Sequence, residues 1–166
     1  MTIADLISII DQKREVLPPS DLEWFEREIG SRLPEDYRQF LLSCGGGDLN
    51  SEVTLSGRDC GAVSSFLGLE DLDRRLLQGY DLRSGTLTAV TLPVPMLPVA
   101  YTESGDPICF CLDHIAPGAV YLIDHDCGGL DVRKWERGRS EIDAEFRVAE
   151  SFTDFVGRLS QMANDK

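Results

Sequence analysis

The residues with the greatest capacity for chemistry in this chain form one run, Asp124-His125-Asp126-Cys127. Carboxylates and an imidazole at the end of a strand can hold a metal ion, or can act as a general acid and base. In an extended segment Asp124 and Asp126 share one face, while His125 and Cys127 share the other. The run therefore supports one hypothesis, in which the chain is a small metal-dependent enzyme.

A zinc site is a second chemical hypothesis, because Cys109 and Cys111 would share one face of a strand. Cys127, with either His125 or His114, would complete the ligand set. Against this, the sequence has no Cys-x-x-Cys pair, and the ligands are spread over separate strands. We therefore expect the cysteines to be small core hydrophobes and the acids to be turn residues, with no metal or other cofactor bound.

Signatures of other enzyme classes are missing from the sequence. It contains no Gly-x-Ser-x-Gly elbow, no phosphate-binding loop and no His-Glu-x-x-His pair. Gly57 and Gly61 bracket a loop that lacks the Lys-Ser/Thr needed to bind phosphate. His114 lies between a strand and Pro117, a position typical of a loop residue rather than of a general base. We therefore predict no catalytic residues and no enzymatic activity.

Composition and charge limit the possible partners. The chain has 166 residues, which is enough for one domain with a substantial core. It contains 16 Lys and Arg residues and 29 Asp and Glu residues, so its formal net charge is −13. Such a surface repels nucleic acid and anionic membranes and favours a basic protein partner, although acidity can also serve solubility alone. We recognise no signal peptide, no membrane-spanning apolar run and no disulfide framework among the five cysteines, so we expect a cytoplasmic protein with reduced thiols.

The first third of the chain predicts a layer of helices, which we place at residues 2–15, 20–30 and 34–44. Capping boxes at Thr2 and Ser20, and a glycine run that begins at Gly45, mark the expected helix ends. Trp24 lies off the apolar stripe of the second helix. We favour a place at the edge of the core for Trp24, since large aromatics are mostly buried, over an exposed anchor for a partner.

Strand patterns follow the glycine run. The strand candidates are residues 53–55, 65–69, 99–101, 108–112 and 119–123. The last of these is continuously apolar, which is typical of a central strand covered on both faces. Pro93, Pro95 and Pro98 argue against a regular central strand at residues 79–98.

Two further helices are expected, a surface helix at residues 70–78 and a final helix that Ser151 caps and whose apolar stripe reaches Met162. Between them, Val132 and Trp135 are candidates for an edge strand. Helices that cover one face of a mainly antiparallel sheet place the chain in the α+β class, as a single domain.

Several short motifs follow one another along the chain: Leu22 to Gly30, Leu33-Pro34-Glu35-Asp36-Tyr37, the helix into Gly45-Gly46, Gly105-Asp106 before the strand at 108–112, the strand Val120–Ile123 ending in Asp124, and Ser151-Phe152-Thr153-Asp154-Phe155. Their order and spacing, from about Pro19 to Leu159, resemble the SUKH superfamily, whose founding member is a fungal cell-wall assembly regulator. The resemblance implies a single SUKH-like domain over residues 1–166, with helices around a curved sheet. Its core would span about 19–160, and residues 1–18 would be an N-terminal helical extension.

The resemblance also implies a binding role without an active site. Bacterial members of the superfamily resemble immunity proteins that block a secreted toxin, and fungal members resemble regulatory scaffolds. Because many toxin domains are nucleases with basic grooves, the net charge of −13 fits the first role. Our first hypothesis is therefore an immunity protein that occludes a basic toxin domain. A regulatory scaffold with an endogenous partner is the second, and the metal-dependent enzyme is the third.

Acidic residues in the predicted loops are the expected contacts with this partner, because loop side chains are free of packing. They are Asp48, Glu103, Asp106, Asp124 and Asp126. A generic solvated acidic surface is the alternative interpretation of each. We expect neither nucleic acid nor membrane among the partners, and we expect a monomer or a weak homodimer.

Overall fold

A large antiparallel sheet organises the computed structural model, which describes residues 1–57, 61–71, 86–87, 90–91, 96–112, 116–123 and 146–161. The strands of this sheet are β1 (Ile10–Asp11), β2 (Gly47–Leu55), β3 (Ala62–Phe66), β6 (Met96–Thr102), β7 (Pro107–Cys111), β8 (Val120–Leu122), β9 (Arg147–Ala149) and β10 (Leu159–Gln161). Their spatial order is β1-β2-β3-β6-β7-β8-β9, and β10 pairs with β2 outside that path. A separate small sheet pairs β4 (Thr86–Leu87) with β5 (Val90–Thr91).

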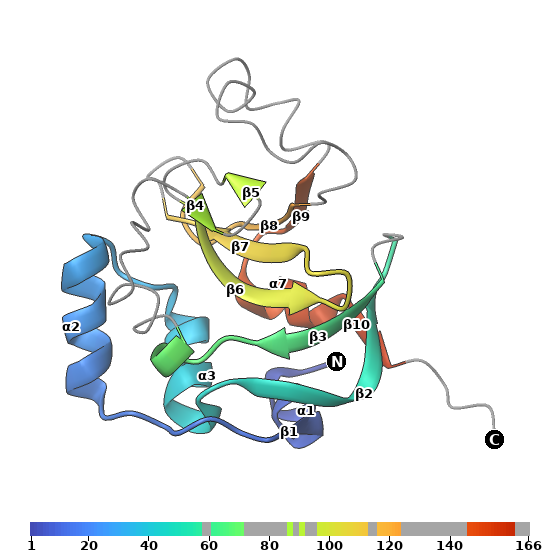
Figure 1. Ribbon diagram of the computed structural model, residues 1–166, viewed down its shortest axis with the longest axis horizontal. Helices are drawn as coiled ribbons and strands as arrows, with labels where there is room; N and C mark the ends of the chain where they lie inside the picture. The colour runs from blue at the N-terminus through green and yellow to red at the C-terminus, as the bar shows by residue number, and fades with distance from the viewer. Residues whose placement is uncertain are drawn as a thin grey trace, which may run out of the picture.

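Helices lie beside and behind this sheet (Figure 1). The described helices are α1 (Ile3–Ile9), α2 (Pro19–Ile29), α3 (Glu35–Cys44) and α7 (Phe152–Gly157). Helix α7 packs against α1 and α3, whereas α2 stands at the left edge of the view in Figure 1. This arrangement confirms the predicted α+β class and single domain. The strand predicted at the sheet centre, β8, does lie between two others and is fully buried.

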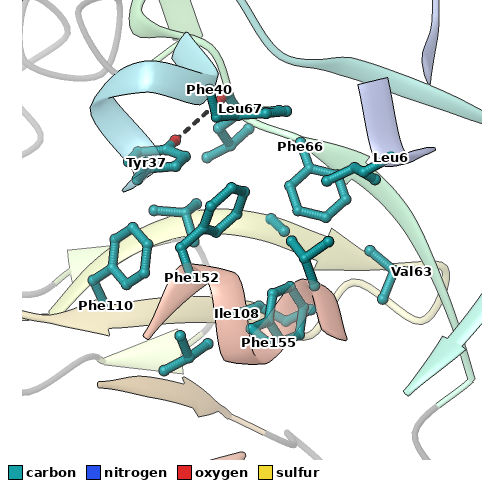
Figure 2. Close-up of a cluster of buried hydrophobic side chains, with 14 of the residues drawn as sticks. Leu6, Tyr37, Phe40, Val63, Phe66, Leu67, Ile108, Phe110, Phe152 and Phe155 are labelled. Atoms are coloured by element: carbon teal, nitrogen blue, oxygen red, sulfur yellow. Dashed lines mark hydrogen bonds between the residues drawn. The ribbon is translucent and has the colours of Figure 1, made fainter. Parts of the chain in front are cut away.

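Aromatic side chains from α3, the sheet and α7 meet in the core (Figure 2). The rings of this cluster are all fully buried, and they belong to Tyr37, Phe40, Phe66, Phe110, Phe152 and Phe155. The ring centroid of Phe152 lies 5.2 Å from those of both Tyr37 and Phe40. The Tyr37 hydroxyl donates a hydrogen bond of 2.9 Å to the Leu67 carbonyl oxygen, so its polar atom is satisfied among apolar neighbours. Burial raises the pKa of the Tyr37 phenol, which therefore stays protonated.

The first helix is shorter than the sequence predicts. The capping box is present, since the Asp5 N–H donates to the Thr2 hydroxyl oxygen at 3.2 Å and the Thr2 N–H donates to the Asp5 carboxylate at 2.8 Å. The helix nevertheless ends at Ile9, and the chain continues as β1, which pairs with β2. The prediction of a helix to residue 15 was wrong because pairing with β2, far along the chain, outweighs the local helical pattern.

Two other helix starts differ from the predictions. Helix α2 begins at Pro19 with no side-chain cap, so the capping box predicted at Ser20 was wrong; the Ser20 hydroxyl donates to the neighbouring Asp21 carboxylate instead. Helix α3 begins at Glu35, one residue after Pro34. The predicted helix ends are confirmed, because Gly30 and Gly45 adopt left-handed φ values of 68° and 72°.

The central strand β6 contains Pro98, which the sequence analysis had excluded from such a position. Strand β3 pairs with β6 only from Ala100 onward, and the register with β7 shifts between Pro98 and Ala100. Pro98 pairs with Cys109 of β7 directly beside this irregularity and precedes the pairing with β3, and a sheet tolerates proline next to such an irregularity.

The remaining differences concern element lengths. The strand predicted at residues 53–55 is the end of the longer β2, and the strand predicted at 65–69 lies earlier, at Ala62–Phe66. The final helix ends at Gly157, and the chain turns into β10, so the predicted helical stripe to Met162 was wrong at its end. Several predicted features lie outside the described residues, namely residues 72–78, Pro93, Pro95, Val132, Trp135 and Met162.

Ser151 caps α7 as predicted, because its hydroxyl oxygen accepts a hydrogen bond from the Asp154 N–H at 3.1 Å. Replacing Ser151 with alanine should lower the free energy of unfolding by about 1 kcal/mol, since that N–H would lose its acceptor. Urea unfolding would measure the change. Ser151→Asn retains an acceptor and serves as the control; equal losses for the two variants would contradict the capping role.

Candidate functional site

The outer side of α2 leaves a large aromatic side chain at the surface. Among the described residues, Trp24 and Val16 are the large hydrophobic side chains that remain exposed, at 38% and 44%. Leu22 and Phe25 form the buried side of α2, three residues apart, and Trp24 points away from that side. Trp24 therefore does not complete the core, which is the place that the sequence analysis favoured for it.

A cleft of about 290 Å³ lies beside Trp24. Its described lining residues are Leu17, Asp21, Trp24, Phe25 and Leu69, and we call it the α2 cleft. Leu17 precedes α2, whereas Leu69 comes from a segment more than forty residues farther along the chain, after β3. Among these described lining residues, four carry apolar or aromatic side chains and Asp21 carries a carboxylate.

Acidic side chains accompany Trp24 along one flank of α2. Asp21, Trp24 and Glu28 are spaced at i, i+3 and i+7, so they follow one another on the same side of the helix. Glu23, on the exposed surface of the same helix, adds a further carboxylate. Arg27, exposed three residues after Trp24, is a base among these neighbours, so Asp21, Glu23 and Glu28 leave this part of α2 with a net negative charge.

Polar contacts on its inner side hold α2 in place. The Glu26 carboxylate pairs with the guanidinium of Arg38 on α3, and both side chains are only 12% exposed. The same carboxylate accepts a hydrogen bond of 2.8 Å from the Leu33 N–H. These contacts and the buried apolar side chains fix the position of α2, so its outer flank is held rigidly at the surface.

Arg14 joins three segments of the chain. Its guanidinium pairs with Asp48 on β2 at 3.3 Å and with Asp71, two residues after the lining residue Leu69. The Asp71 carboxylate also accepts a hydrogen bond of 2.9 Å from the Gly68 N–H. The positive charge of Arg14 is therefore compensated by two carboxylates.

The structure separates the acidic residues that the sequence predicted as contacts. Asp48 lies in strand β2 rather than in a loop, and its side chain is 51% exposed. Glu103 is exposed in the turn between β6 and β7. Asp48 pairs with Ser65 near the end of β3, whereas the Glu103 N–H donates to the carbonyl oxygen of Ala62 at the start of β3, so the two acids lie at opposite ends of that strand. Asp124 and Asp126 lie outside the described residues.

Asp106, the third of these acids that the structure describes, is buried, with 3% exposure. Its carboxylate accepts a hydrogen bond from the Ser104 hydroxyl at 2.9 Å, and its own N–H donates to the Thr102 hydroxyl oxygen at 3.0 Å. Asp106 therefore shapes the turn between β6 and β7 and offers little surface to a partner.

The predicted face shared by Cys109 and Cys111 is present on β7, where both thiols are buried in a small apolar cluster with Tyr121. No group of three or more His, Cys, Asp or Glu side chains that could hold a metal ion occurs in the part of the chain that the structure describes. His114, His125 and Cys127, which the zinc hypothesis requires, lie outside that part.

The described groups with shifted pKa values support helices and the core. The hydrogen bond from Arg158 lowers the pKa of Asp154, and the hydrogen bond from the Thr2 N–H lowers that of Asp5. Burial raises the pKa of the Cys44 thiol, so it stays protonated and unreactive. Local hydrogen bonds or burial explain these shifts, as expected of groups that stabilise the fold.

Comparison with known proteins shows where this architecture belongs. A sequence model of the SMI1 / KNR4 family (SUKH-1) matches residues 17–158, most of the chain. The chain belongs to the SMI1/KNR4 family. This result confirms the resemblance to the SUKH superfamily. Proteins of the family are generally non-catalytic and are known from interactions between toxins and immunity proteins.

A curated relative extends the comparison to an individual protein. The SPbeta prophage-derived uncharacterized protein YokK of Bacillus subtilis (strain 168) is 26% identical over 157 residues, covering 83% of this chain and 72% of that protein.

None of the helices in the described ranges has the length and apolarity that a bilayer crossing requires.

The motifs that carried the resemblance to SUKH contact one another in this structure. Asp36, from the Leu-Pro-Glu-Asp-Tyr motif, accepts hydrogen bonds from the N–H and the hydroxyl of Thr153, at 2.8 and 2.9 Å. Tyr37, from the same motif, packs its ring against Phe152. Thr153 and Phe152 both belong to the final motif. These SUKH motifs therefore join α3 to α7, which makes them features of the fold rather than of a binding surface.

Sequence analysis missed the α2 cleft. Trp24, off the apolar stripe of its helix, was the available signal, and it was assigned mainly to the core. Leu69 could not be linked to Leu17 from the sequence, because only the fold brings these distant positions together.

Proposed function

We propose that this SUKH protein is a non-catalytic binding protein of the immunity type, which neutralises a cognate toxin in the cytoplasm by covering its functional surface. Membership of a family known from toxin–immunity interactions is the observation that carries the proposal. The partner would be a protein domain of basic character, and neither nucleic acid nor membrane is part of the proposed role.

Charge supports a basic partner. The formal net charge is −13. Exposed acids on the described surface are Asp5, Asp11, Glu15, Glu23, Glu28, Glu35, Glu52, Glu103 and Glu150, against the exposed bases Lys13, Arg27, Arg32 and Arg158. Complementary charge speeds encounter with a basic protein and disfavours acidic competitors. Asp48, Glu103, Asp124 and Asp126 stay predictions as individual contacts.

Co-expression with a toxin tests the proposed role. The chain would be produced together with each toxin domain encoded by a neighbouring gene, in a host that the toxin arrests. We expect one of these toxins to be neutralised, with growth restored, because binding would cover its functional surface. An acidic protein of unrelated fold and similar charge is the control. If every neighbouring toxin still arrested growth while the co-expressed chain was present in soluble form, the result would count against the immunity role.

A further inference from the structure

We propose that the α2 cleft is the docking site for the toxin, and that it receives an apolar side chain flanked by Lys or Arg on the toxin surface. The inference rests on the proposed immunity function and adds the place and chemistry of contact. Trp24 would be its central anchor, with Asp21 and Glu28 beside it.

Apolar exposure first points to this part of the surface. Of the two large hydrophobic side chains that stay exposed among the described residues, Trp24 lines the α2 cleft, and Val16 immediately precedes the lining residue Leu17 in the chain. Tryptophan beside an apolar hollow is the residue type that most often dominates binding energy at protein interfaces. Covering Trp24 and the half-buried Leu17 would remove apolar surface from water.

The fold provides a second reason, because Trp24 is not needed to attach α2. Leu22 and Phe25 are buried, and the Glu26–Arg38 ion pair fixes the inner side of the helix. Trp24 therefore stands on a rigid support, and little conformational entropy would be lost when a partner covers it.

Charge decides which occupant fits. Asp21 lies in the cleft itself, and Glu28 follows Trp24 on the same flank. Arg14, whose partner Asp71 lies two residues after Leu69, is paired with Asp48 and Asp71, and Arg27 is the exposed base on α2 itself. A basic segment would therefore meet carboxylates around an apolar centre. A second copy of this chain, with its own net charge of −13, would be repelled.

Affinity measurements on variants of the full-length chain test the inference. The probe is the purified, catalytically inactivated toxin domain that the chain neutralises. We expect Trp24→Ala to weaken binding by about thirtyfold or more, and Trp24→Phe, which keeps an aromatic ring, by about fivefold or less. Thermal unfolding of each variant would show that the fold is retained.

A matched pair of charge variants separates the cleft from the rest of the acidic surface. Asp21→Asn and Glu103→Gln each remove one negative charge, the first inside the α2 cleft and the second in the distant turn between β6 and β7. We expect Asp21→Asn to weaken binding by about fivefold and Glu103→Gln by less than about twofold, because exposed distant charges are screened by salt. The reverse order would overturn docking at the cleft.

A spectroscopic readout reports on Trp24 directly. The chain has two tryptophans, so Trp135→Phe labelled with 5-fluorotryptophan gives one fluorine resonance, from Trp24. We expect unlabelled toxin domain to shift this resonance.

The possible outcomes separate the two proposals. An unmoved resonance, or wild-type affinity in Trp24→Ala, would overturn the cleft as the docking site and leave the immunity function standing. Loss of self-association in Trp24→Ala would assign the cleft to a second copy. Absence of binding by the wild-type chain would overturn both proposals.

Discussion

Replacing Phe152 with alanine should lower the free energy of unfolding by about 4 kcal/mol, which is the expected cost of removing a fully buried aromatic ring. Phe152 is completely buried and lies at the centre of the aromatic cluster in Figure 2. Its ring centroid is 5.2 Å from those of Tyr37 and Phe40, and 6.1 Å from those of Phe66 and Phe110. The substitution would remove both apolar burial and edge-to-face contacts, and would leave a cavity between α3, α7 and the sheet.

Guanidinium unfolding followed by circular dichroism would measure this loss. Phe152→Leu is the matched control, since it keeps most of the apolar volume and should lose only about 1.5 kcal/mol. Val16→Ala, at an exposed position, should stay within about 0.5 kcal/mol of the wild type. A loss below about 1 kcal/mol in Phe152→Ala would show that this cluster does not hold the helices to the sheet.

Replacing Gly68 with alanine should also destabilise the fold strongly, by about 3 kcal/mol, through forced overpacking. A Cβ atom at Gly68 would lie 1.9 Å from the Gly45 carbonyl oxygen, a distance that no side-chain rotation can relieve because the obstacle is backbone. The added methyl would push the segment after β3 away from the end of α3. That movement would also strain the hydrogen bond from the Gly68 N–H to Asp71.

Gly157→Ala is the matched control for this prediction. Gly157 ends α7 without a left-handed φ, and a Cβ atom there would meet nothing within 4 Å. That variant should be neutral or more stable by about 0.5 kcal/mol, because alanine restricts the unfolded chain. Thermal unfolding of both variants gives the comparison. Similar midpoints for Gly68→Ala and the wild type would mean that the two backbones do not pack as closely as the structure shows.

The predictions that held depend on local chemistry. The ends of α2 and α3 are set by glycines that adopt left-handed φ, and the start of α7 is set by the Ser151 hydroxyl. Strand β8 was recognisable because a continuous apolar run indicates burial on both faces. Each of these features is encoded within a few residues, where propensity and capping dominate.

The predictions that failed depend on partners far along the chain. Strand β1 follows α1 directly because β2 is available to pair with it, and Pro98 is tolerated in β6 because the ladder is irregular there. No pattern within one segment reports such neighbours.

Charge, helix ends and motif order are properties of the chain alone, and they suffice to recognise an acidic α+β domain of the SUKH type. The exposure of Trp24, and the meeting of Leu17 and Leu69 beside it, became visible in the fold. Burial and clefts depend on which distant segments pack together, and the apolar pattern of a single helix does not specify that packing.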